Sequence, residues 1–213
     1  MQKAILLLLL AILPATATTI EEAARSQVGV TTGYDPSYVR LSYPDGDVPQ
    51  ESGVCTDVVI RALRKAKNFD LQKAVHEDMK ANFSAYPKNW GHKAPDANID
   101  HRRVPNLEKF FERKGWKQPI GKKGPDYKPG DIVTVRLPGG LPHIMIVSSK
   151  KNEEGTPLAI HNISTGGSIV QSLLQAPRFL GIHNIGAGTR EEDCLFTYRL
   201  VGHYRFPEKA TDQ

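Results

Sequence analysis

Residues 53–66 read GVCTDVVIRALRKA, and this stretch predicts an amphipathic helix that begins at a cysteine. Residues that recur at helical spacing form its apolar face: Cys55, Val59, Ala62, Leu63 and Ala66. The opposite, solvated face is expected to carry Asp57, Arg61 and Arg64. Because unpaired N–H groups and the dipole of a helix N-terminus favour thiolate, Cys55 is a candidate nucleophile. The alternative is a small apolar core residue without chemistry.

The N-terminus has the pattern of a secretory signal. Lys3 is followed by an apolar run, residues 4–13, and then by PATA, residues 14–17, which fits an A-x-A cleavage site. We therefore expect a signal peptide over residues 1–17 and a single domain over residues 18–213. Since the chain has no cysteine for a lipid anchor just after the predicted cleavage site, the mature protein is expected to be periplasmic or secreted.

The composition argues against several classes of partner. The net charge is +5, and the basic residues are scattered, which is not the pattern of a nucleic-acid-binding protein. No second long apolar run follows the signal, so stable membrane insertion is not expected. The seven histidines occur without H-E-x-x-H or paired C-x-x-C motifs, so no cofactor is predicted and a metal site is the weaker alternative. The sequence does not predict the oligomeric state.

The order of the predicted elements indicates an α+β fold with N-terminal helices packed on a C-terminal antiparallel sheet. Helices are predicted near the N-terminus up to about Gly29, over 70–82, and from Pro105 to Lys114. Strands are predicted over 132–137, 143–147, 158–163 and 197–206. Three glycines after the third of these strands are interpreted as turns: Gly181, Gly186 and Gly188.

Two histidines in neighbouring strands are the candidate partners of the cysteine. His143 begins an otherwise apolar strand and is the candidate base, while His161 lies in the next strand. Side chains of paired antiparallel strands lie about 5 Å apart, so His161 can orient the ring of His143. Asn162 is the polar alternative, but it faces the opposite side of the strand, so only one of the two can serve.

The motifs GVCTDVV, PGDIVTV, PHIMIV and AIHNI, in residues 53–66 and 129–163, resemble the NlpC-type cysteine peptidases of the papain-like superfamily. The resemblance implies a helix-borne cysteine nucleophile, a histidine base at the start of a strand, and a polar residue on the next strand. The sequence departs from the usual Asp-Cys-Ser-Gly motif, because Val54 precedes Cys55 and Thr56 follows it. The stretches YDPSYV, LSYPDGDVP and NIDHRRVPNL resemble a group of bacterial exported proteins known as a domain of unknown function.

Two loops are candidates for substrate binding. The long loop over residues 31–53 carries tyrosines that can line a groove, and arginines of the 100–103 loop can make forked hydrogen bonds to a carboxylate. An ordinary ion-paired loop is the alternative for the arginines. The candidate substrate-binding residues are Tyr34, Tyr43, Asp57, His101, Arg102 and Arg103.

The sequence therefore predicts an exported thiol hydrolase that cleaves peptide or amide bonds through Cys55, His143 and His161, with peptidoglycan stem peptides as the expected substrate. One alternative is a non-catalytic domain on the same fold that binds the cell wall or a protein. A structural Cys55–Cys194 disulfide would favour that alternative. A third possibility is an acyltransferase that passes the acyl group to an amine.

Overall fold

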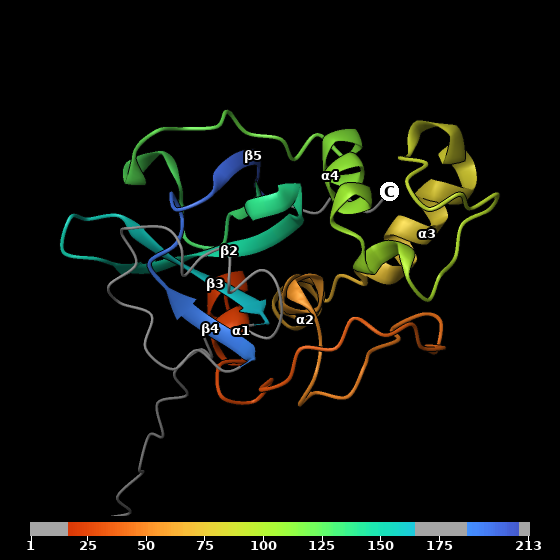
Figure 1. The fold of residues 1–213 in the computed structure, drawn as a ribbon, viewed down its shortest axis with the longest axis horizontal. Helices are drawn as coiled ribbons and strands as arrows, with labels where there is room; N and C mark the ends of the chain where they lie inside the picture. The colour runs from red at the N-terminus through yellow and green to blue at the C-terminus, as the bar shows by residue number, and fades with distance from the viewer. Residues whose placement is uncertain (1–16, 165–186, 209–213) are drawn as a thin grey trace, which may run out of the picture.

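The computed structural model describes residues 17–164 and 187–208 (Figure 1). Apart from Ala17, the predicted signal peptide lies outside the described residues, as do the turns predicted at Gly181 and Gly186. Across the described part of the chain, no helix has the length and apolar character needed to cross a membrane.

Helices occupy the first half of the chain and strands the second. The helices are α1 (Ile20–Arg25), α2 (Cys55–Lys67), α3 (Leu71–Asn82) and α4 (Val104–Arg113). Short 3₁₀ turns span Phe83–Ala85, Asp100–Arg102, Gly124–Asp126 and Pro138–Gly140. The strands are β1 (Ile132–Arg136), β2 (Pro142–Lys151), β3 (Pro157–Ile163), β4 (Gly188–Glu192) and β5 (Arg199–Tyr204).

The strands form one antiparallel sheet of five strands in the order β4-β3-β2-β1-β5. This confirms the predicted α+β class and the packing of N-terminal helices on a C-terminal antiparallel sheet. The turn predicted at Gly188 is wrong, because this residue begins β4 and pairs with Ile163. Its φ of +129° favours glycine, and a Cβ there would lie 2.8 Å from the carbonyl oxygen of Thr31.

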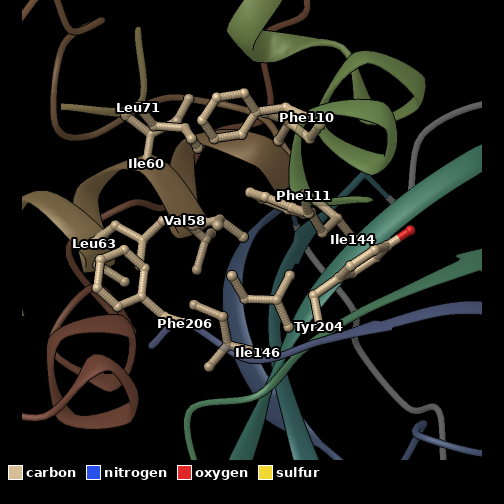
Figure 2. Packing of buried hydrophobic residues seen from close by; sticks show 14 of the residues in the cluster. Val58, Ile60, Leu63, Leu71, Phe110, Phe111, Ile144, Ile146, Tyr204 and Phe206 are labelled. Carbon is tan, nitrogen blue, oxygen red and sulfur yellow. The ribbon is translucent and has the colours of Figure 1, made fainter. Parts of the chain in front are cut away.

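The helices cover one face of the sheet. Figure 2 shows Val58 and Leu63 of α2 and Phe111 of α4 near Ile144 and Ile146 of β2. A second apolar cluster covers the other face and includes Val133, Val135, Met145, Val147, Ala159, Ile163, Cys194 and Leu195. The central strand β2 is therefore buried on both sides, which holds the start of this strand, at His143, in a fixed place.

The two cysteines lie in different clusters. Cys55 belongs to the helix-side cluster and Cys194 to the cluster on the opposite face, and both thiols are free. The alternative of a structural Cys55–Cys194 disulfide therefore does not apply, because the sheet separates the two residues.

Candidate active site

Cys55 is the first residue of α2, where the chain changes from an extended to a helical backbone. Val54, the N-cap residue, has no polar side chain, and its own N–H instead donates to the carboxylate of Asp57 at 2.6 Å. This bond fixes the first turn of the helix and hence the position of the Cys55 thiol.

Asp57 does not lie on the solvated face where the sequence predicted it. It is only 3 % exposed, and Arg102 donates to its two oxygens at 3.0 and 2.9 Å. Arg102 also donates to the carbonyl oxygens of Ser37 and Asp35. The helical pattern could not reveal this burial, because the compensating charge comes from a loop 45 residues away.

Burial dominates the acidity of the candidate nucleophile. Cys55 is 6 % exposed, and burial raises the pKa of its thiol to about 12, with Asp57 adding to the effect. Backbone N–H groups of Ile144, Thr56 and Cys55 itself oppose the shift but do not cancel it. The expectation that the helix N-terminus favours thiolate is therefore outweighed by desolvation, and the resting group is a neutral thiol.

The two predicted histidines meet on the face of the sheet opposite the helices. Nε2 of His143 lies 2.7 Å from Nδ1 of His161, and Nε2 of His161 lies 2.8 Å from Oε1 of Glu192 on β4. The side chain of Asn162 points to the other face, where it donates to the carbonyl oxygens of Gly33 and Gly53. His161, and not Asn162, is therefore in contact with His143.

The hydrogen-bond chain assigns the tautomers. Burial raises the pKa of Glu192, but the hydrogen bond from His161 and the charge of Arg190 keep it below its usual value, so Glu192 is ionised and accepts from Nε2–H of His161. Nδ1 of His161 is then an acceptor for Nε2–H of His143. Burial lowers the pKa of His143 well below its usual value, so its ring is neutral and Nδ1 is the nitrogen without a hydrogen.

Two contacts bring Cys55 to the residues on either side of His143. The backbone N–H of Ile144 is near enough to the Cys55 sulfur to oppose the rise of its pKa, and Pro142 lines the same pocket as Cys55. Within the described residues no hydrogen bond joins the Cys55 sulfur to either imidazole. Catalytic hydrogen bonds are often long in unliganded enzymes and shorten when the substrate binds.

The pocket at Cys55 has a volume of about 220 Å³, and its walls are mainly apolar. Its lining residues are Tyr34, Pro36, Val54, Cys55, Trp90, Ile99, Arg102, Arg103, Val104, Pro105 and Pro142. The guanidinium of Arg103 lies 4.2 Å from the centre of the Trp90 ring and 3.4 Å from a carboxylate oxygen of Asp100. Arg103 is thus only weakly neutralised and can accept a substrate anion, whereas Arg102 is fully paired with Asp57.

Three predicted substrate-binding residues lie outside this lining, and one of them is Asp57, which pairs with Arg102. Tyr43 is 45 % exposed, and its ring meets the edge of His76. His101 is buried, and burial together with the charge of Arg102 lowers its pKa to about 4. Tyr34, Arg102 and Arg103 are the predicted substrate-binding residues that line the pocket with Cys55.

Sequence reasoning missed three residues at the site. Trp90 comes from an irregular loop, while Glu192 and Cys194 come from β4 and the turn after it. β4 reads GTREE, which has no apolar alternation and so gave no strand signal. Its pairing with β3 nevertheless brings His161, Glu192 and Cys194 together, with one ligand atom of each within 4.8 Å of the others.

Comparison with known proteins gives two matches. The domain of unknown function DUF1287 matches residues 21–181 and 167–206. The chain is 53 % identical over 191 residues to the uncharacterized protein YijF of Escherichia coli (strain K12), which covers 90 % of this chain and 82 % of that protein.

Proposed function

The chain belongs to the DUF1287 family, and we propose that this member is a thiol hydrolase of papain-like fold that cleaves peptide or amide bonds in peptidoglycan stem peptides. The observation that carries the proposal is the chain of contacts from Glu192 through His161 to His143, whose neighbour in sequence, Pro142, lines the pocket of Cys55. Export through a signal peptide over residues 1–17, leaving one domain over residues 18–213, is part of the proposal and would bring the enzyme to its substrate.

The reaction begins from neutral partners. Cys55 lies on the helix side of the sheet and the ring of His143 on the other side, so the mechanism requires His143 to approach the sulfur around the start of β2 when the substrate binds. Its Nδ1 then takes the proton of the Cys55 thiol as the sulfur attacks the substrate carbonyl, and the resulting imidazolium is stabilised through His161 by the charge of Glu192. The N–H of Cys55 is a donor for the developing oxyanion. His143 then gives its proton to the leaving amine, which leaves an acyl group on the sulfur, and water releases this group as a carboxylate.

The pocket supports an anionic peptide as the substrate. Arg103 offers a guanidinium whose one carboxylate partner among the described residues lies 3.4 Å away, so it can pair with a carboxylate of a stem peptide. Tyr34 and Trp90 line the same pocket as Cys55 and supply ring surfaces for the aliphatic part of the peptide. Asp57 and Arg102 position the first turn of α2 and do not need to touch the substrate.

The burial of Cys55 favours a second candidate, a non-catalytic domain that binds a cell-wall fragment in the same pocket. A thiol whose pKa is raised to about 12 is a poor nucleophile unless a base takes its proton during attack. In this alternative Arg103, Tyr34 and Trp90 keep their binding roles, and Cys55 is an apolar wall residue.

Incubation with purified muropeptides, followed by mass spectrometry of the products, tests the proposal. The unmodified chain should produce fragments that have gained water, whereas Cys55→Ser and His143→Gln should produce none. His76→Gln is the matched control, because this half-buried histidine lies outside the site and should leave turnover unchanged. An active Cys55→Ser variant would overturn the hydrolase, and binding without turnover in the unmodified chain would support the second candidate. Fragments joined to an added amine would indicate acyl transfer.

A further inference from the structure

A compact group of metal-binding atoms lies on the sheet face opposite the helices. Sγ of Cys194 is 3.6 Å from Nε2 of His161 and 3.6 Å from Sδ of Met145. Nε2 of His161 is also the atom that Glu192 contacts at 2.8 Å. Cys194, His161 and Met145 are buried, while the side chain of Glu192 is 35 % exposed and gives the group its contact with solvent.

These spacings fit donors that share one ion. A metal about 2.3 Å from a thiolate sulfur and about 2.0 Å from an imidazole nitrogen separates the two donors by about 3.5 to 3.7 Å at tetrahedral to trigonal angles. The measured 3.6 Å between Cys194 and His161 falls in that range, so little rearrangement is needed. The register supports this, because Ile146 pairs with Ile160 and the neighbouring Met145 and His161 therefore leave the sheet on the same face.

The donor set selects a soft ion. A thiolate and a thioether prefer monovalent copper, and imidazole accepts it as well. We propose that Cys194, His161 and Met145 form a binding site for monovalent copper, with Glu192 as the group that gives way when the ion binds. Binding releases the thiol proton of Cys194, so that the ion meets a thiolate.

Copper at this site would switch off the proposed base, a consequence that rests on the proposed function. When the ion takes Nε2 of His161, the one hydrogen of that neutral ring moves to Nδ1. His161 then donates to Nε2 of His143, and the hydrogen of His143 moves to its Nδ1. Nδ1 of His143 can no longer accept the Cys55 proton, so the loaded protein is inactive.

The binding part is tested without any substrate. The full-length mature chain, reduced and kept free of oxygen, is titrated with the coloured complex of monovalent copper and bicinchoninate. One ion per chain should transfer to the protein, and Cys194→Ser and Met145→Leu should each lower the affinity by about tenfold or more. Cys55→Ser is the matched control and should bind copper like the unmodified chain, because Cys55 lies on the other face of the sheet.

Thermal unfolding of each variant shows whether it folds, and Cys194→Ala replaces Cys194→Ser if the serine variant does not. No copper transfer to the unmodified chain, or equal affinity in folded Cys194 variants, would overturn the site. Binding of Zn²⁺ in its place, lost in Glu192→Gln but kept in Met145→Leu, would also overturn the copper assignment.

The switch is tested by the ratio of turnover with copper to turnover without it, measured within each variant. In the unmodified chain one equivalent should lower turnover by about a hundredfold, the size of a general-base contribution. The ratio should stay near one in Met145→Leu at the same copper concentration. Equal inhibition of both proteins would overturn the switch, whereas absence of turnover with intact copper binding would count against the proposed function alone.

Discussion

Nε2 of His143 lies 2.7 Å from Nδ1 of His161, although the two residues are 18 positions apart and belong to different strands. Both rings are buried, so neither can exchange this contact for water. A contact between two imidazoles needs one hydrogen, and the ionised Glu192 at the far side of His161 determines where it lies. The acidic residue that sequence analysis missed therefore fixes the tautomer of the candidate base.

Replacing Glu192 with glutamine should weaken catalysis without unfolding the protein. The imidazolium of His143 loses a stabilising charge, so turnover of muropeptides should fall by about 10- to 100-fold. The base also becomes easier to deprotonate, so the acidic limb of the pH–rate profile should move to lower pH. Exposed Glu153, replaced in the same way, is the control. An unchanged pH profile in Glu192→Gln would contradict the role of this carboxylate.

Removing Arg102 should destabilise the fold strongly. Arg102→Leu leaves the Asp57 carboxylate buried without its partner, at a cost of about 3–5 kcal/mol in the free energy of unfolding. Urea denaturation measures the loss, and the double variant Asp57→Asn, Arg102→Leu should recover part of it. Lys117→Ala, which removes an exposed ion pair with Glu112, should cost less than about 1 kcal/mol. A similarly small loss in Arg102→Leu would show that the buried pair is not needed.

Buried His101 should make stability depend on pH. Its folded pKa is lowered to about 4 by burial and Arg102, so the unfolded chain binds the proton more readily between about pH 6.5 and 4. Its contribution is fully present above about pH 6.5 and is lost as the pH falls toward 4.

Between pH 7 and 5 the unmodified chain should therefore lose about 2 kcal/mol more free energy of unfolding than His101→Gln, measured by urea denaturation at both values. Val28→Ala, which removes an exposed side chain and no titratable group, should keep the pH dependence of the unmodified chain. If the free energy of unfolding of the unmodified chain and of His101→Gln changed equally between pH 7 and 5, His101 would bind its proton as readily in the folded chain as in the unfolded chain.

Periodicity was sufficient for the elements that pack on the helix-side core. The pattern of residues 53–66 and the apolar runs near His143 and His161 predicted α2, β2 and β3, since their buried faces repeat at the period of the element. Pro105 at the start of α4 was also predicted correctly. β4 was missed because its residues GTREE are held by pairing with β3 and by ion pairs, such as Glu191 with Arg25, and not by an apolar face.

In the site, too, local patterns predict some features, whereas others depend on residues far away in the sequence. The meeting of His143 and His161 follows from alternation along two adjacent strands, so the sequence could predict it. The burial of Asp57 and the approach of Glu192 depend on partners 45 and 31 residues away, and no local pattern encodes such distances. The thiol pKa was expected in the wrong direction because desolvation, which exceeds the helix N-terminal effect, depends on the packing of the whole core.

The same desolvation predicts slow alkylation of Cys55. With its pKa raised to about 12, the thiolate fraction near pH 8 is small, so iodoacetamide should label Cys55 at least about a hundredfold more slowly than a free peptide thiol. Cys194 should also react slowly, because burial raises its pKa well above the usual value. Mass spectrometry reports the two sites separately, and guanidinium chloride provides the control, since unfolding without reductant should make both label rapidly. Rapid labelling of Cys55 in the folded protein at pH 7 would contradict the neutral resting thiol and indicate an activated thiolate, whereas labelling that requires reductant would indicate a disulfide.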